Sequence, residues 1–179
     1  MFLLDTSGSM RGQESLVVDG VNKVLQDMQD TYNKLQSTEQ YKLLFYAFSD
    51  SSKRLMMEGT FESQLSVENY VTGGGTPLFD VIVETIGEVP DRSTIVIATD
   101  GEDTTSSKFS RSETRRAILA AKENRDIDFV FVAKGMEAFN EAERIGVRQA
   151  VNIAGFENFA GSASVPCSAS VFRYENKKE

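Results

Sequence analysis

The chain has 179 residues, of which 40% are hydrophobic and 26% are charged, as is typical of one globular domain with a substantial core. Its net charge is −8, from 19 Lys and Arg against 27 Asp and Glu residues, so it should repel nucleic-acid phosphate and anionic membranes. The longest apolar run, residues 43–48, is far shorter than the roughly 20 residues of a membrane span. We therefore expect a single domain over residues 1–179, with no nucleic-acid partner and no membrane association.

Cysteine usage and the first residues bear on the compartment. The chain holds one cysteine, Cys167, so it cannot form an internal disulfide, which fits a reducing compartment. Only Met1 to Leu4 precede the first motif, so we expect no signal peptide in this chain. Both observations favour a cytoplasmic location, and the sequence leaves the oligomeric state open.

The first half of the chain predicts a strand, a long helix and a hairpin. Phe2–Leu4 is a short apolar run, as in a buried strand. Apolar residues then recur at intervals of three, four and seven, which predicts an amphipathic helix over residues 12–36. Residues 41–48 are almost continuously apolar or aromatic and predict a strand buried on both faces. A turn at residues 49–52 and a returning strand at residues 53–61 complete the hairpin.

Helices and strands alternate after the hairpin. We predict helices over residues 77–88, 112–124 and 136–145, and strands over residues 93–98, 127–133 and 148–153. Thr76 is the predicted N-cap of the first of these helices, with Pro77 at its first position. Residues 154–166 show no period, and residues 167–179 form either a terminal helix or an ordered tail. Because strands that alternate with helices pair in parallel, the sequence predicts an α/β fold with helices on both faces of the sheet.

Three stretches carry oxygen-bearing side chains at the ends of these elements. They supply Asp5, Ser7 and Ser9 after the first strand, Thr76 in Gly-Gly-Gly-Thr-Pro-Leu before a helix, and Asp100 in Thr-Asp-Gly after a later strand. Because the carboxyl ends of parallel strands meet at one edge of a sheet, we expect Asp5 and Asp100 to rise from the same edge. Gly8 should allow an extended loop to turn, so that Ser7 and Ser9 point the same way as Asp5. The three glycines of the middle stretch should allow close approach of another backbone.

The donor chemistry of these side chains is that of a hard cation. Hydroxyl and carboxylate oxygens suit Mg²⁺, which takes six oxygens at about 2.0–2.1 Å and keeps waters readily. The sequence has no His, and its one Cys is in none of these stretches, which argues against zinc or copper. Two aspartates balance the charge of the ion. A position is left open for a carboxylate from another molecule.

Together the three stretches resemble the metal-ion-dependent adhesion site of the von Willebrand factor type A domain family. That motif reads Asp-x-Ser-x-Ser, then Thr, then Asp. Asp5, Ser7 and Ser9 match its first part, Thr76 its second and Asp100 its third. The resemblance covers the chain from the first strand to at least Ile153. The stretches Leu-Asp-Thr-Ser-Gly-Ser-Met and Thr-Asp-Gly-Glu-Asp resemble those of bacterial and phage members.

The resemblance implies a Rossmann-like, doubly wound, mostly parallel sheet with one antiparallel edge strand. It implies Mg²⁺, with Mn²⁺ or Ca²⁺ as substitutes, bound directly by Ser7 and Ser9, directly or through water by Thr76, and mostly through water by Asp5 and Asp100. The Asp or Glu of a protein partner completes the coordination, so the expected function is metal-dependent protein binding in adhesion or assembly. The ligand-linked switching of some members is not expected, because the C-terminal stretch is a poor helix.

An enzyme is the alternative. A metal-dependent hydrolase or phosphotransferase of the α/β class would use Asp5 as nucleophile, with a second acid at the next-but-one position or a Lys or Arg clamp, but position 7 is Ser. A Ser-His-Asp triad is impossible without His. Neither a Gly-x-Ser-x-Gly elbow nor a Gly-x4-Gly-Lys-Ser/Thr loop occurs. We therefore predict a binding module without enzymatic activity.

Four further acidic residues are of interest around these stretches. Asp50, Glu102 and Asp103 are candidate acceptors for metal-bound water, and for Glu102 and Asp103 a solvated loop charge is the alternative. Asp80 lies one turn into a predicted helix, where a negative charge interacts favourably with the helix N-terminus. None of the four belongs to the predicted ligand set.

Overall fold

The computed structural model describes residues 1–152 apart from residues 35–40, 51, 61, 102, 134 and 149. In that part of the chain, six strands form one sheet in the order β3-β2-β1-β4-β5-β6. The strands are β1 (Phe2–Asp5), β2 (Leu43–Ser49), β3 (Ser52–Gly59), β4 (Thr94–Thr99), β5 (Asp128–Ala133) and β6 (Ala150–Asn152). β3 pairs antiparallel with β2 at one edge, and every other pair is parallel. The predicted mostly parallel sheet with an antiparallel edge strand is confirmed.

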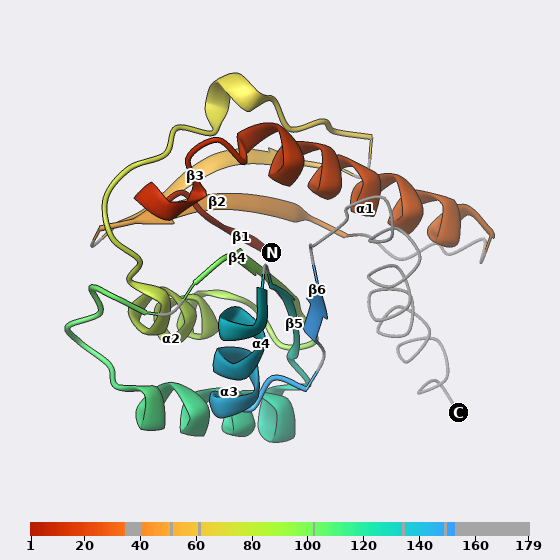
Figure 1. Ribbon diagram of the computed structural model, residues 1–179. Coiled ribbons are helices and arrows are strands. Elements are labelled where there is room, and N and C mark those ends of the chain that lie inside the picture. The colour runs from red at the N-terminus through yellow and green to blue at the C-terminus, as the bar shows by residue number, and fades with distance from the viewer. Residues whose placement is uncertain are drawn as a thin grey trace, which may run out of the picture.

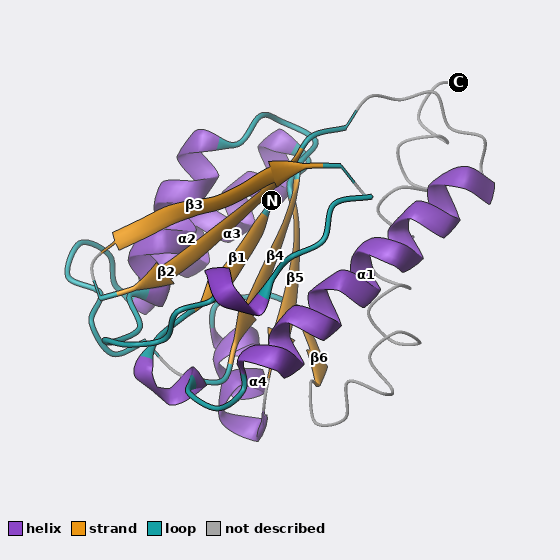
Figure 2. Cartoon of the chain, turned by 90° about the horizontal axis from the view of Figure 1, so that it is seen from above, coloured by secondary structure: helices purple, strands orange, loops and turns teal. Residues whose placement is uncertain are grey.

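Helices lie on both faces of this sheet, as predicted. They are α1 (Glu14–Lys34), α2 (Leu78–Glu88), α3 (Arg111–Arg125) and α4 (Gly135–Arg144), with the short 3-10 turns η1 (Gly8–Met10) and η2 (Val67–Asn69). Figures 1 and 2 show α1 across one face, whereas α2, α3 and α4 lie on the other. Within the described residues, no helix has the length and apolar character needed to cross a membrane.

The alternation of strand side chains produces two hydrophobic cores. Phe2 and Leu4 of β1 pack under α1, whereas Leu3 between them packs under α2, α3 and α4. Phe2 also stacks on Phe45 of β2, with ring centroids 4.7 Å apart. Because both faces of β1 are buried, the end of this strand is held in a fixed position.

Most predicted boundaries lie within two residues of the observed ones. The helix predicted from residue 12 begins at Glu14, because Gly12 has a φ of 80°, which a right-handed helix cannot include. The strand predicted from residue 41 begins at Leu43. The expectations for residues 35 and 36, for Phe61 and for residues 153–179, including Cys167, lie outside the described residues, as does the part of the single-domain prediction that covers them.

The start of α2 differs from the prediction. Pro77, rather than Thr76, occupies the N-cap position, and it provides no side-chain cap. A free N–H of the first turn is instead satisfied by the loop that follows β4, because Asp103 Oδ1 accepts a hydrogen bond from the N–H of Phe79 at 3.1 Å. The capping role predicted for Thr76 is therefore wrong. A carboxylate from a neighbouring loop makes a local cap unnecessary.

Candidate metal centre

Asp5 and Asp100 lie together at the carboxyl ends of two neighbouring strands in the middle of the sheet. β1 and β4 are adjacent and parallel, with Leu4 opposite Ala98. Asp5 is the last residue of β1, and Asp100 directly follows β4. In the sheet, β2 lies on one side of β1 and β4 lies on the other, so the strand order diverges at β1. Open α/β sheets bind ligands at the carboxyl ends of the strands where the order diverges. The prediction that both aspartates rise from the same edge is confirmed.

The loop after β1 is a tight turn and not the extended loop that was predicted. Ser7 is the N-cap of η1, and the N–H of Met10 donates to the carbonyl oxygen of Ser7 at 3.1 Å. Met10 is buried in the core under α1, which holds the turn against the sheet. The turn places the hydroxyl groups of Ser7 and Ser9 side by side, as expected, but by a different backbone path.

Three of the predicted ligands form a continuous row of oxygens. Ser7 Oγ lies 3.0 Å from Ser9 Oγ, and Ser9 Oγ donates to Asp100 Oδ1 at 2.9 Å. In an octahedron with metal–oxygen distances of about 2.0–2.1 Å, neighbouring oxygens are about 2.9 Å apart, so this row has the spacing of Mg²⁺ ligands. The same spacing allows hydrogen bonds, which satisfy these oxygens when no ion lies between them.

Gln13 supports one end of this row. Its Nε2 donates to the carbonyl oxygen of Ser9 at 3.1 Å and lies 3.5 Å from Asp100 Oδ2. The amide therefore joins the loop after β1 to the carboxylate that follows β4. It also presents a hydrogen-bond donor beside the row of oxygens.

Asp5 is fully buried next to this row. Its Oδ1 accepts a hydrogen bond from the N–H of Ser7 at 2.8 Å, and its Oδ2 accepts one from the hydroxyl of Thr99 at 2.6 Å. Burial raises the pKa of Asp5 above its usual value, and the hydrogen bonds from Thr99 and Ser7 only partly oppose that effect. A nearby cation would stabilise the charged form, so the electrostatics of Asp5 suit a metal centre.

Thr76 reaches the same region through its backbone. The N–H of Gly8 donates to the carbonyl oxygen of Gly74 at 2.9 Å, so the glycine stretch before Thr76 runs beside the turn after β1. Thr76 is buried, and its N–H donates to Thr104 Oγ1 at 2.8 Å. Its carbonyl oxygen accepts a hydrogen bond from the N–H of Thr104 at 2.9 Å. Thr76 is thus attached to the loop that follows Asp100.

Two of the three glycines before Thr76 are needed for close approach. Gly74 has a φ of 79°, and a Cβ there would lie 2.2 Å from Asp50 Oδ1. A Cβ on Gly75 would lie 2.3 Å from Cγ2 of Thr105, whereas one on Gly73 would meet nothing within 4 Å. The predicted close approach of backbone is seen where Gly73 and Gly74 hydrogen-bond to Thr6 and Gly8, whereas at positions 74 and 75 the missing Cβ makes room for side chains.

Two of the additional acidic residues, Asp50 and Asp103, have structural partners. Asp50 Oδ1 accepts a hydrogen bond from the N–H of Gly75 at 3.0 Å, and Asp103 caps α2. Both carboxylates therefore fix the loops around the candidate centre. Glu102 lies outside the described residues.

Sequence reasoning did not single out Thr99, Tyr70 or Gln13. Thr99 directly precedes Asp100 at the end of a predicted strand, which was a usable signal. Tyr70 donates its buried hydroxyl to the carbonyl oxygen of Asp5 across 65 residues of sequence, and burial raises the pKa of that hydroxyl. No local pattern marks Tyr70, so only the fold reveals this contact.

The side chains that hydrogen bonds bring together here are the hydroxyls of Ser7 and Ser9 and the carboxylate of Asp100, whereas the contacts of Thr76 are made by its backbone. Within the described ranges, no group of three or more His, Cys, Asp or Glu side chains is arranged to hold a metal ion. Hydroxyl and carboxylate oxygens with octahedral spacing fit Mg²⁺ better than a transition metal. The oxygens of Ser7, Ser9 and Asp100 therefore have a chemistry and spacing that suit the predicted ion.

Comparisons with known proteins bear on the fold. No family model and no curated protein matches the chain. Among solved structures, the chain is similar to the pilus adhesin SpaC from Lactobacillus rhamnosus GG in its open conformation, with a TM-score of 0.65 and 11% identity over 97% of this chain. The match covers 30% of that adhesin. At this identity the likeness shows a shared fold, in agreement with the α/β architecture.

Proposed function

We propose that the chain is a Mg²⁺-dependent protein-binding module with a metal-ion-dependent adhesion site of the von Willebrand factor type A kind. Its ligands are Asp5, Ser7, Ser9, Thr76 and Asp100. The proposal rests on the 3.0 Å and 2.9 Å spacing of the Ser7, Ser9 and Asp100 oxygens where β1 and β4 end. The Rossmann-like, doubly wound arrangement belongs to the same proposal. It is supported by a strand order that diverges at β1 and by helices on both faces.

Each residue has a distinct role in this proposal. Ser7 and Ser9 bind the ion directly, Thr76 binds it directly or through water, and Asp5 and Asp100 act mostly through water. When bound, the ion supplies a Lewis acid for a carboxylate oxygen. The two aspartates bring the site close to neutral charge, so an Asp or Glu of a protein partner meets no net repulsion there. Mn²⁺ and Ca²⁺ are the expected substitutes.

The geometry supports an enzyme that uses Asp5 as nucleophile less well. Asp5 is fully buried, and both of its carboxylate oxygens already accept hydrogen bonds, from Ser7 and Thr99. A nucleophile needs an oxygen that reaches the substrate. This arrangement favours a structural and electrostatic role for Asp5 over catalysis.

Metal titration tests the proposed function. Protein treated with EDTA and then dialysed should gain about 2.7 kcal/mol of stability at a Mg²⁺ concentration near 100 times the dissociation constant, which thermal unfolding measures. Ser9→Ala should lose this gain while keeping its circular dichroism spectrum, because it removes the central oxygen of the row. Ser112→Ala, at an exposed position of α3, is the control and should respond like the wild type. A wild type that does not respond to Mg²⁺ would refute the proposal.

A further inference from the structure

The loop between β4 and α3 contains a segment, residues 103–109, that we call the strap. Its first part is attached to Thr76, whose carbonyl oxygen accepts hydrogen bonds from the N–H groups of Thr104 at 2.9 Å and Thr105 at 3.2 Å. The hydroxyl of Thr105 also donates to the carbonyl oxygen of Asp50 at 2.8 Å. Since Asp100 lies on the same loop, the strap links two of the proposed ligands.

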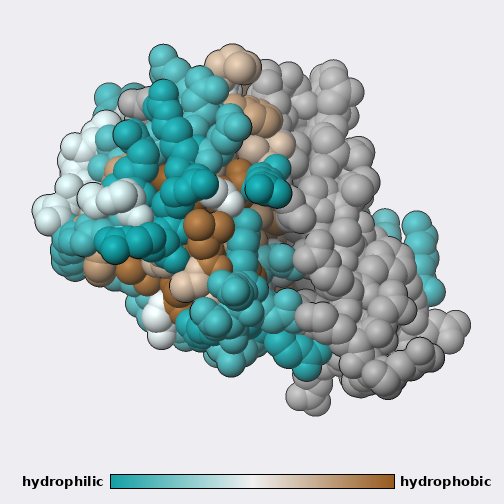
Figure 3. Space-filling view, turned by 90° about the horizontal axis from the view of Figure 1, so that it is seen from below, coloured by the Kyte–Doolittle hydropathy of each residue, from teal (hydrophilic) through white to brown (hydrophobic). Residues whose placement is uncertain are grey.

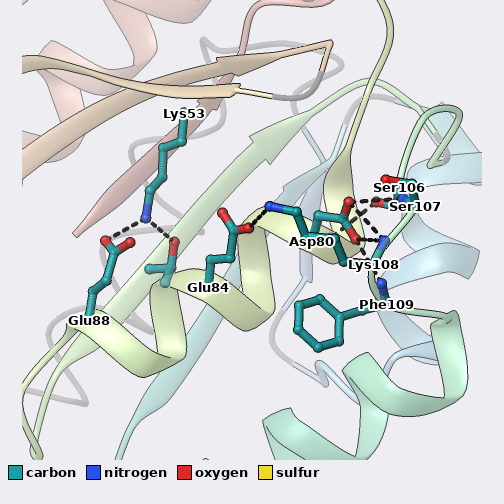
Figure 4. Close-up of polar contacts among 9 residues, drawn as sticks. Lys53, Asp80, Glu84, Glu88, Ser106, Ser107, Lys108 and Phe109 are labelled. Atoms are coloured by element: carbon teal, nitrogen blue, oxygen red, sulfur yellow. Dashed lines mark hydrogen bonds and ion pairs between the residues drawn. The ribbon is translucent and has the colours of Figure 1, made fainter.

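The second part of the strap is attached to Asp80 in the first turn of α2. Figure 4 shows the carboxylate of Asp80 facing the backbone of the strap. Oδ1 accepts hydrogen bonds from the N–H groups of Lys108 at 3.0 Å and Phe109 at 2.9 Å. Oδ2 accepts from the N–H groups of Ser107 at 2.9 Å and Lys108 at 3.2 Å. One buried carboxylate therefore satisfies three consecutive backbone donors.

The backbone of Asp80 is joined to the strap as well. Its N–H donates to Ser106 Oγ at 3.0 Å, and the hydroxyl of Ser106 donates to the carboxylate of Asp103. Asp103 in turn caps α2 through the N–H of Phe79. The start of α2 and the strap thus form one hydrogen-bond network. The strap side chains that accept hydrogen bonds from the first turn of α2 belong to the loop that carries Asp100, so these bonds also hold that loop in place.

Only an anion meets the demands of this position. Three N–H donors face two oxygens, and hydrogen bonds to an ionised acceptor are roughly twice as strong as neutral ones. An amide at position 80 would present one N–H₂ group to these donors and leave a partly buried N–H of the strap without its acceptor. Asp80→Asn therefore changes no proposed ligand but weakens the attachment of the strap.

We propose that Asp80 is a positioning residue of the metal centre, which holds the strap so that Thr76 and Asp100 keep their places before the ion arrives. The inference rests on the proposed function. A site whose loops are already ordered does not spend binding free energy on ordering them. Loss of the hydrogen bonds from the strap to Asp80 should thus lower the affinity for the ion. Asp80 would act through the strap, because its described hydrogen bonds do not include the five ligand side chains.

Isothermal titration calorimetry with Mg²⁺ tests this role. Asp80→Asn should bind Mg²⁺ about 10-fold more weakly or worse than the wild type, the range typical of residues that orient metal ligands. Asp91→Asn is the matched control, because it makes the same chemical change in a carboxylate that pairs with Arg125 beyond the other end of α2. It should leave the affinity unchanged. Thr104→Val, which removes the acceptor for the N–H of Thr76, should also weaken binding and serves if Asp80→Asn does not fold.

Hydrogen exchange in the metal-free protein gives an independent readout. In Asp80→Asn the amides of residues 107–109 and of Thr104 should exchange faster, whereas Val130 in β5 should stay protected. Wild-type affinity in folded Asp80→Asn would overturn the positioning role alone. A wild type that binds no Mg²⁺ would overturn the proposed function, and the positioning role with it.

Discussion

At the scale of single residues, Asp5 is a carboxylate of the candidate centre in a buried position that disfavours its ionised form. The side chain is fully buried, and its hydrogen bonds from Thr99 and Ser7 only partly offset the cost of desolvation, which raises its pKa. A raised pKa in the folded state means that ionised Asp5 destabilises the metal-free protein. In the proposed function, a bound cation would remove this cost, and the burial of Asp5 would then couple folding to metal binding.

The pH dependence of Asp5→Asn follows from this shift. Stability from a carboxyl with a raised pKa is complete below its unfolded pKa of about 3.9 and is lost as pH rises through the folded pKa. In EDTA, the melting temperature of Asp5→Asn minus that of the wild type should therefore increase between about pH 4 and pH 7. Each unit of upward pKa shift corresponds to about 1.4 kcal/mol.

Added Mg²⁺ provides the second half of this test. It should stabilise the wild type at pH 7 and leave Asp5→Asn unchanged, because the amide carries no charge to balance the ion. A difference in melting temperature that stays constant or shrinks as pH rises would show that Asp5 does not carry the raised pKa.

At the scale of elements, the glycine stretch shows why three loops can meet at one point. Gly74 and Gly75 leave space for Asp50 and Thr105, whose side chains would otherwise clash with a Cβ. The N–H of Asp50 also donates to the carbonyl oxygen of Gly75 at 2.8 Å. The loops after β2 and β4 therefore close around the segment that leads to Thr76.

Alanine substitutions separate the two kinds of glycine in this stretch. Gly75→Ala should destabilise the protein by about 1–3 kcal/mol, because the new methyl displaces Thr105 and breaks its hydrogen bond to Asp50. Gly73→Ala should have an effect near zero, since a Cβ there meets nothing within 4 Å. Chemical denaturation measures both, and equal effects would contradict the packing described for Gly75.

At the scale of the whole molecule, the buried cores position the candidate centre, and the net charge of the chain acts on an approaching partner at longer range. Two cores fix β1 from both sides, so the candidate centre lies at the end of a strand that is buried on both faces. The coloured part of the surface in Figure 3 is mainly hydrophilic, with apolar atoms visible at several places between the polar ones. The net charge of −8 opposes the approach of an acidic partner, so binding in the proposed function depends on the short-range contact with the ion.

The salt dependence of peptide binding separates the long-range repulsion by the net charge from the short-range contact with the ion. A short peptide with several Asp residues should bind in Mg²⁺ but not in EDTA, and its association rate should rise with NaCl because salt screens the overall repulsion. The matching Asn peptide should not bind. Stopped-flow fluorescence of a labelled peptide measures the rate. An association rate that falls with salt would show that the surface attracts acidic ligands, and binding that is indifferent to EDTA would exclude coordination by the ion.

The local pattern of the sequence was sufficient to predict the order and type of the elements. Apolar periodicity and turn residues depend on neighbours in the chain, so strands and helices were placed to within two residues, as for α2 and β5. The types of the oxygen-bearing residues at strand ends also suggested the ligand set. These features follow from backbone geometry and residue chemistry, which a sequence carries directly.

Contacts between distant segments were decided only by the tertiary structure. Thr99 binds Asp5 across 94 residues, and Asp103 caps α2 across 24 residues, so neither contact leaves a periodic trace in the sequence. The tight turn after β1 depends on the burial of Met10, and the role of Asp80 depends on a strap that comes from another loop. The residue types in the sequence were enough to identify oxygens that suit a cation. The distances between the side chains of Ser7, Ser9 and Asp100 depend on how the strands and loops pack, so only the tertiary structure decided them.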